Sequence, residues 1–302
     1  MTAQPPTLKE RALGAYIGLA VGDALGATTE FLTPREIAEQ HGTHDTISGG
    51  GWLKLKPGEV TDDTEMSLAL GDSIIGHDGV EPLAVVEAFS NWMRSKPVDI
   101  GNTVRRGIIN YRTRGESSVP VNEYDAGNGA CMRTLPIALL CCHASDEEMR
   151  LASQRQAHTT HNNPVSDAGT ETVNRMLISL LHGADKSELE ALASQLVADY
   201  PEYRFDKRRA ENPSGYIVDT LQVVFQAFFA HDDFESILID VVNRGGDADT
   251  TGAIVGMLAG ACYGLQAIPE RWGNSLNPRV KALCMEQTDA LLAMAEVRRG
   301  SA

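Results

Sequence analysis

Apolar residues recur along this chain at the three- and four-residue steps that place side chains on one face of a helix. The clearest runs are Leu13, Ile17, Val21 and Ala24, and Ile217, Leu221, Val224, Phe225 and Phe228. No convincing strand-like alternation of apolar and polar residues accompanies them. The pattern therefore predicts an all-α fold of many helices.

Local signals divide this pattern into elements. Helix starts are expected at Thr33-Pro34, near Asp146, at Asn163-Pro164 and at Asn212-Pro213. Loops are expected near residues 41–58, 115–128 and 201–213. None of these loops is long or biased enough to be a linker between domains.

Glycine repeats at every fourth position in two of the expected helices. The two ladders are Gly14, Gly18, Gly22 and Gly26, and Gly252, Gly256, Gly260 and Gly264. Glycine within a helix costs about 1 kcal/mol relative to alanine, so the ladders need a reason such as a close helix crossing. We expect the two helices to cross closely and to bring Glu30 beside Asp247 and Asp249. The alternative is that the glycines belong to helices that do not touch.

Composition narrows the class of protein. The chain has 302 residues, 42% of them hydrophobic, which is enough for a large core. Its 41 acidic and 26 basic residues give a net charge of −15, which disfavours nonspecific binding to nucleic acids or anionic membranes. Five cysteines without a CxxC motif are typical of reduced, buried thiols.

The termini and apolar runs predict a cytoplasmic protein. The N-terminus lacks the basic-then-apolar order of a secretory signal. The longest apolar run, from Ala253 to Ile268, is shorter than the roughly 20 residues that span a bilayer and contains several glycines. We therefore expect a core helix there and no transmembrane segment.

Three acid-rich turns adjoin the expected helices. They are Glu30 after Gly22–Gly26, the run Thr61-Asp62-Asp63-Thr64-Glu65, and the run from Gly245 to Gly252 with Asp247, Asp249 and Thr250. Oxygen donors without a nearby Cys or His motif favour magnesium, manganese or calcium over zinc. Each turn alone is also compatible with acids and a threonine cap at a helix N-terminus. Together they could hold two cations, with Asp249 between them, in a site that activates water.

Two known motifs with the same letters do not fit the last turn. An EF-hand calcium loop that starts at Asp247 needs a glutamate at its twelfth position, where Leu258 stands. The nucleophile motif of aspartate-dependent phosphatases should follow an apolar strand, whereas Arg244-Gly245-Gly246 precedes this one. Neither interpretation is retained.

The middle of the chain offers weaker candidates for substrate contacts. Small residues from Ala126 to Ala130 could expose backbone amides to a phosphate, although an ordinary glycine-rich loop has the same composition. His158 and His161 lie on either side of two threonines, where each could contact a ligand or make a structural hydrogen bond.

Assembled, these residues resemble the ADP-ribosylglycohydrolase family over nearly the whole chain. The motifs that carry the likeness are Gly22-Asp23-Ala24-Leu25-Gly26 with Glu30, Gly49-Gly50-Gly51-Trp52, Val60 to Met66, Pro97-Val98-Asp99-Ile100-Gly101, Ala126-Gly127-Asn128-Gly129, Tyr216 to Thr220, and Gly245 to Gly252. They match most closely the members that act on dinitrogenase reductase in nitrogen-fixing bacteria. The resemblance implies one compact, orthogonal multi-helix bundle over residues 1–302 with a dinuclear metal cleft, and a flexible N-terminal tail at residues 1–8.

The resemblance also implies the cofactors and the role of each motif residue. Two divalent cations, Mn²⁺ or Mg²⁺, would be held by Glu30, Thr61, Asp62, Asp63, Asp247, Asp249 and Thr250, with Asp249 bridging. Asp99, Glu30 and Asp62 would act in catalysis. The substrate would be contacted by Asn102, Gly127, Asn128, Gly129, His158, His161 and Tyr216.

The implied activity is metal-dependent hydrolysis of the N-glycosidic bond between ADP-ribose and an arginine side chain. Metal-held water and a proton-transferring carboxylate suit this bond, because the guanidine needs a proton to leave. Direct attack by water and prior opening of the ribose ring are both open. The implied partners are ADP-ribosylated dinitrogenase reductase, a PII signalling protein, and the membrane through reversible recruitment by a partner. The alternatives are the same chemistry on another ADP-ribosylated target, such as serine-linked groups or nucleic-acid ends, or a non-catalytic ADP-ribose-binding module.

Overall fold

A computed structural model describes residues 4–300, and within this range the chain forms helices and no strand. Its elements are α1 (Leu8–Gly26), α2 (Pro34–His41), α3 (Asp62–Gly76), α4 (Pro82–Arg94), α5 (Asn102–Arg114), α6 (Leu135–Leu140), α7 (Asp146–Ala157), α8 (Pro164–Leu181), α9 (Lys186–Asp199), η1 (Pro201–Tyr203), α10 (Ile217–Ala230), α11 (Phe234–Val242), α12 (Ala248–Tyr263), η2 (Leu265–Ala267), α13 (Glu270–Ser275) and α14 (Pro278–Arg299). The predicted all-α fold is confirmed.

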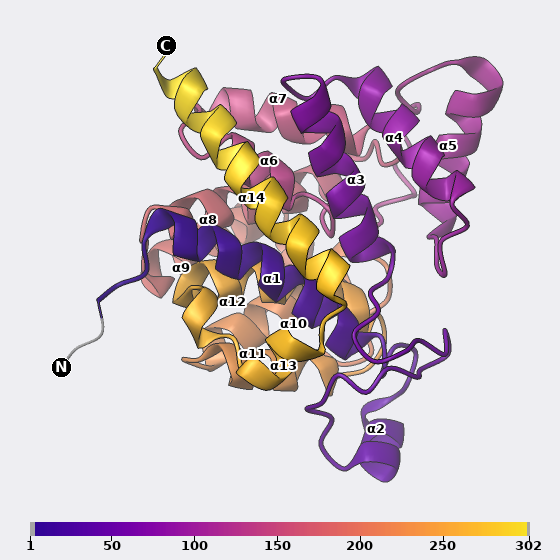
Figure 1. Cartoon of the computed structure of the whole chain (residues 1–302). Coiled ribbons are helices and arrows are strands. Elements are labelled where there is room, and N and C mark those ends of the chain that lie inside the picture. The colour runs from indigo at the N-terminus through magenta and orange to yellow at the C-terminus, as the bar shows by residue number, and fades with distance from the viewer. Residues whose placement is uncertain (1–3, 301–302) are drawn as a thin grey trace.

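Helices α1 and α12 form the centre of the molecule and pack against each other over most of their length (Figure 1). Every residue of α1 from Arg11 to Gly26 is buried. A Cβ atom added to Gly18 would lie 2.2 Å from the carbonyl oxygen of Gly256, and one added to Gly256 would lie 2.1 Å from the oxygen of Gly18. The backbones therefore touch where the ladders meet, as the glycine spacing predicts.

Several other helices pack around this central pair. Helix α14 crosses α1 and α3, while α8, α10 and α11 pack on α12 (Figure 1). Helix α2 lies at the edge of the bundle, after the turn that carries Glu30. This packing directs the C-terminal end of α1 and the N-terminal ends of α3 and α12 to one region of the molecule.

Most expected boundaries are confirmed. Thr33, Ser145 and Asn163 cap α2, α7 and α8 with their side chains. The start expected at Asn212-Pro213 is wrong, because α10 begins at Ile217 and Asn212 adopts a φ of 51°. There the backbone pairs with the 244–247 turn instead: Asn212 N donates to Arg244 O at 2.9 Å.

The N-terminal segment begins its helix earlier than expected, whereas the cysteines agree with the prediction. The tail expected at residues 1–8 does not reach Leu8, since Leu8 begins α1 and Thr7 is its N-cap; residues 1–3 lie outside the described part. All five cysteines are free, four of them buried, in agreement with the expected reduced thiols. No helix within residues 4–300 is both long and apolar enough to cross a bilayer.

Candidate metal and substrate cleft

A cleft of about 570 Å³ opens where the ends of α1, α3, α5 and α12 meet. Most of the residues singled out from the sequence line it: Glu30, Asp62, Asp99, Asn102, Gly127, Asn128, Gly129, His161, Asp247, Asp249 and Thr250. Because these residues come from six separate segments of the chain, their convergence is a property of the fold. The cleft is the candidate functional site.

Three carboxylates form the tightest acidic group in this cleft. One oxygen each from Glu30, Asp247 and Asp249 lies within 4.8 Å of the other two. Glu30 stands in the turn that follows α1, Asp247 is the N-cap of α12, and Asp249 lies in the first turn of that helix. The close crossing of α1 and α12 therefore brings them together.

The start of α3 supplies a second acidic group beside the first. The Oγ1 atoms of Thr61 and Thr250 lie 3.2 Å and 3.4 Å from Oδ2 of Asp63. The other carboxylate oxygen of Asp63 is buried and has no hydrogen-bond partner. A buried acceptor without a partner, on a carboxylate whose other oxygen adjoins two hydroxyl groups, is what a bound cation would satisfy.

The electrostatics of the cleft are unfavourable for bare carboxylates. Burial, followed by neighbouring carboxylates, raises the pKa of Asp62, Asp63 and Asp249 well above the usual range. Burial also raises the pKa of Glu30 to about 8, despite a hydrogen bond from the indole of Trp52. Like charges this close ionise together only if a cation compensates them.

The donor set fits a hard divalent cation. The group formed by Glu30, Asp247 and Asp249 contains carboxylate oxygen only, with no cysteine or histidine in it. Magnesium, manganese and calcium take such ligands, whereas zinc in proteins favours nitrogen and sulfur. The cluster can therefore bind metal, and its chemistry leaves the choice among hard cations open.

Asp99 faces the same cleft from the loop before α5. It is half-buried, and burial raises the pKa of its carboxyl. Its Oδ1 accepts a hydrogen bond from Ile100 N at 2.8 Å, and the next turn brings Gly101 N to 3.2 Å from Oδ2 of Asp62. The loop thus fixes Asp99 beside the acidic cluster, with Asn102 at the start of α5.

The glycine loop lies against the imidazole of His161. A Cβ on Gly127 would be 2.9 Å from Nε2, and one on Gly129 would be 2.7 Å from Cε1. The ring is buried, which lowers its pKa to about 3 and keeps it neutral. The structure places His161, and not His158, at the cleft, because His158 Nε2 lies 2.9 Å from a carboxylate oxygen of Asp167 outside it.

Two contacts of this loop are not evident from the sequence. The amide of Asn128 donates to Oδ2 of Asp247 at 2.6 Å and to Oγ1 of Thr220 at 2.9 Å, so this side chain orients a carboxylate of the acidic group. Tyr216 pairs with Gly127 through an isolated backbone bridge and is about 40% exposed beside the cleft. In the sequence, the only signal for the Asn128 contact was the motif Ala126-Gly127-Asn128-Gly129.

Two aromatic residues, Trp52 and Phe31, form an edge of the cleft, and the sequence alone did not predict their contact with Glu30 and with each other. The indole of Trp52 donates to Oε2 of Glu30 at 2.6 Å, and its ring lies 5.4 Å from that of Phe31. The preceding glycines make this approach possible: Gly51 has a φ of 64°, and a Cβ there would lie 2.3 Å from Ala27 O. The run Gly49-Gly50-Gly51-Trp52 was the available signal.

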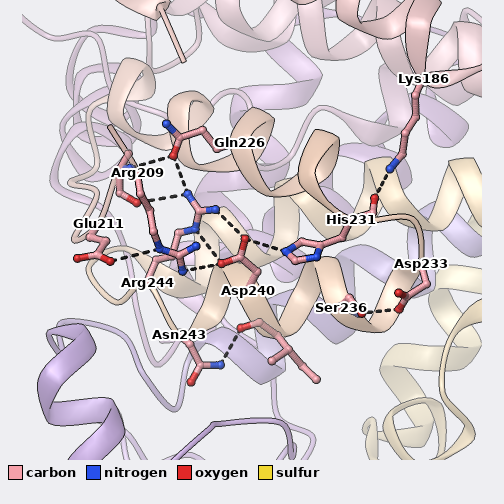
Figure 2. A network of polar contacts seen from close by, with 12 residues as sticks. Lys186, Arg209, Glu211, Gln226, His231, Asp233, Ser236, Asp240, Asn243 and Arg244 are labelled. Atoms are coloured by element: carbon pink, nitrogen blue, oxygen red, sulfur yellow. Dashed lines mark hydrogen bonds and ion pairs between the residues drawn. The ribbon is translucent and has the colours of Figure 1, made fainter. Parts of the chain in front are cut away.

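A partly buried ionic network precedes the acidic turn of α12 (Figure 2). Arg244 donates to Asp240 at 2.7 Å and to Gln226 at 2.8 Å, which ties the end of α11 to α10. Figure 2 shows Arg209 and His231 on the same carboxylate. Arg209 Nη2 lies 2.6 Å from Oδ1 of Asp240, and His231 Nε2 lies 3.1 Å from Oδ2. Although burial opposes ionisation, the two guanidinium groups lower the pKa of Asp240 to about 2.

The turn after Arg244 has no room for side chains. Gly245 and Gly246 have φ values of 70° and 65°, and a Cβ on either would lie within 2.3 Å of a carbonyl oxygen. Asp247 N then donates to Pro213 O at 2.8 Å. Anchored on one side by the ionic network and on the other by the 212–213 backbone, the turn presents Asp247 and Asp249 in fixed positions.

Comparison with known proteins agrees with this arrangement. The chain is 49% identical over 291 residues to the ADP-ribosyl-[dinitrogen reductase] glycohydrolase of Rhodospirillum rubrum, covering 96% of this chain and 98% of that protein. It is 34% identical to the ADP-ribosylarginine hydrolase Tri1 of Serratia proteamaculans, over 88% of this chain and 75% of that protein.

A solved structure described as an ADP-ribosylglycohydrolase-related protein complex has the same fold. The TM-score is 0.83 and the sequence identity 36%, with 95% of this chain and 99% of that chain covered. A sequence model described as ADP-ribosylglycohydrolase matches residues 4–300. With its helical core, its acidic cleft and these relatives in agreement, the chain belongs to the ADP-ribosylglycohydrolase family.

Proposed function

We propose that this protein is a metal-dependent hydrolase that cleaves the N-glycosidic bond between ADP-ribose and an arginine side chain. The observation that carries the proposal is the meeting of Glu30, Asp247 and Asp249 with the start of α3 in one buried cleft. The names of the relatives from R. rubrum and S. proteamaculans support the choice of substrate.

The proposed cofactors are two divalent cations, Mn²⁺ or Mg²⁺. Thr61, Asp62 and Asp63 would hold one of them, and Glu30, Asp247 and Thr250 the other, with Asp249 between the two. Bound there, the cations would hold the ribose hydroxyls and lower the pKa of a water molecule. They would also offset the repulsion between the diphosphate of the substrate and the acidic wall of the cleft.

The residues of the chain divide the remaining tasks. Scission of the bond leaves positive charge at the anomeric carbon, which the surrounding carboxylates stabilise. The guanidine leaves only with a proton, and Asp99, which lies outside the proposed set of metal ligands and whose pKa is raised by burial, would deliver one. Asp99 and Asp62 face the same space and would move the proton of the water.

The opposite wall of the cleft suits the rest of the substrate. Gly127 and Gly129 let a diphosphate approach the backbone closely, because neither has a side chain. Arg105 and Asn102 also line the cleft and would supply a cation and an amide. We place Tyr216 and His161 near the distal ribose or adenine, and His158 outside the binding surface.

The proposal is tested by incubating the protein and Mn²⁺ with ADP-ribosylarginine, with a serine-linked ADP-ribosyl peptide and with free ADP-ribose. We expect release of ADP-ribose from the arginine conjugate only, and none after the metal is stripped. Asp249→Ala should lose metal binding and hydrolysis together. Equal turnover by metal-stripped protein or by this variant would refute the mechanism, and binding of ADP-ribose without turnover would indicate a binding module.

The proposed protein substrate is ADP-ribosylated dinitrogenase reductase, the target in the name of the R. rubrum relative. A second protein carrying ADP-ribosylarginine is the matched comparison. A markedly higher kcat/KM for dinitrogenase reductase would support a role in regulating nitrogen fixation, and equal values would favour a general arginine-directed hydrolase. A PII protein as partner and recruitment to the membrane through a partner stay predictions.

A further inference from the structure

Asp23 is a fully buried carboxylate in the last turns of α1. It accepts hydrogen bonds from Thr61 N at 3.0 Å, from Thr61 Oγ1 at 2.9 Å, from Thr64 N at 3.1 Å, and from Thr64 Oγ1. No arginine, lysine or histidine within residues 4–300 forms an ion pair with it. Every bond that holds this charge in place therefore comes from the first turn of α3.

The start of α3 has no cap from its own segment. Thr61 is the N-cap residue, yet its side chain accepts no hydrogen bond from the helix. The N–H groups of the first helical turn are ordinarily satisfied by such a side chain. Here Asp23, 41 residues away from Thr64 in sequence, accepts from Thr64 N and takes that place.

Asp23 also decides where the hydroxyl proton of Thr61 points. Oγ1 of Thr61 lies 2.9 Å from Oδ1 of Asp23 and 3.2 Å from Oδ2 of Asp63, but the hydroxyl has one proton. Donation to Asp23 leaves lone pairs of Thr61 and of Asp63 facing the same space. Two oxygen atoms without a proton between them are suited to a shared cation.

We propose that Asp23 is a positioning residue for the metal site: it caps α3 from α1 and orients Thr61, and through the helix start it holds Asp62 and Asp63 in place for a divalent cation. The inference rests on the proposed metal-dependent function. Carboxylates and carbonyls behind the ligands of a metal commonly hold those ligands in this way, and their loss typically weakens metal affinity by 10- to 100-fold.

The competing explanation is that Asp23 only stabilises the fold. An equally destabilising variant far from the cleft separates the two explanations, because it lowers the melting temperature without touching the start of α3. Leu189→Ala in α9 is such a control: Leu189 is fully buried, and α9 packs mainly on α8 and η1.

The test uses Asp23→Asn in the full chain, with Mn²⁺ titrated calorimetrically into protein stripped of metal, below the melting temperature of each variant. An asparagine retains one acceptor but presents an NH₂ group to the donors of Thr64, so it cannot accept all four bonds. We expect the Kd for Mn²⁺ to rise about 10- to 100-fold in Asp23→Asn and to stay within twofold of wild type in Leu189→Ala.

Hydrolysis of ADP-ribosylarginine at increasing Mn²⁺ is the second readout. We expect the Mn²⁺ concentration for half-maximal rate to shift as the Kd does, with kcat at saturating Mn²⁺ close to wild type. Should Asp23→Asn not fold, Thr64→Val and Thr64→Ser form a matched pair: only the valine removes the hydroxyl bond to Asp23, so only it should weaken Mn²⁺ binding.

The outcomes separate this inference from the proposed function. Wild-type affinity for Mn²⁺ in Asp23→Asn, or equal affinities in Thr64→Val and Thr64→Ser, would overturn the positioning role and leave the proposed hydrolase intact. A wild-type protein that binds no Mn²⁺ at all would overturn both.

Discussion

Replacement of Gly256 by alanine tests the reason for the central helix crossing. The new Cβ would lie 2.1 Å from Gly18 O and 2.8 Å from Gly18 C, both of them backbone atoms of a buried helix. Since non-bonded contacts of carbon in proteins settle at about 3.5–4.0 Å, the helices would have to separate by roughly 1.4 Å or more. No flexible side chain at this point can move aside instead.

The expected loss follows from two opposing contributions. Overpacking of a core costs typically about 1–3 kcal/mol, and the rigid obstacle here favours the upper end of that range. Alanine gains about 1 kcal/mol over glycine in a helix interior. The free energy of unfolding should therefore fall by roughly 2 kcal/mol, and, at about 2–4 °C per kcal/mol for domains near this size, Tm should fall by about 4–8 °C.

The measurement is thermal unfolding of the metal-free protein, followed by circular dichroism. Gly76→Ala is the matched control, because Gly76 ends α3 and a Cβ there meets no atom within 4 Å. We expect this variant to keep or slightly raise Tm. If Gly256→Ala were as stable as Gly76→Ala, close contact between α1 and α12 would not be what the glycines provide.

Three other variants and conditions test the site and its support. Asp99→Asn should remain folded and bind Mn²⁺ but lose most turnover; loss of Mn²⁺ binding in calorimetry would make Asp99 a metal ligand instead. Burial raises the pKa of Glu30 from 4.5 to about 8, so between these pH values the folded metal-free protein binds more protons than the unfolded chain. The Tm of the metal-free protein should therefore fall as pH rises from 5 to 8. The gain in Tm on adding Mn²⁺ should grow over the same range, because the cation competes with the proton. If the Tm of the metal-free protein did not change between pH 5 and 8, the raised pKa of Glu30 would be contradicted. Arg244→Met should lower the free energy of urea unfolding by roughly 3 kcal/mol, since Asp240 stays charged and buried; a loss below 1 kcal/mol would show that Arg209 suffices.

The glycine ladders show how far sequence reasoning reached into the fold. Helical periodicity depends on neighbours three and four residues apart, so it is readable without the structure. The cost of glycine in a helix then implies a close neighbour, and the contact of Gly18 with Gly256 confirms it. From that contact alone, the approach of Glu30 to Asp249 could be anticipated.

Asn212-Pro213 shows where local signals failed. The pair has the composition of a helix start, yet its backbone bonds the 244–247 turn, a partner more than thirty residues away. Such a bond outweighs the local preference because it satisfies the backbone carbonyl of Arg244, a buried residue. The two histidines differ for a related reason, since nothing adjacent to them encodes that His161 lies against Gly127.

By itself, the sequence determined that this protein is helical, that two of its helices touch through glycine, and that its acidic turns offer oxygen donors suited to a hard cation, because propensity, periodicity and donor chemistry reside in short segments. Only the tertiary structure decided that Asp23 holds the start of α3 and that Asn128 orients Asp247. Those hydrogen bonds join segments about 40 and 120 residues apart. Their partners are chosen by how the whole bundle packs, and no local pattern carries that information.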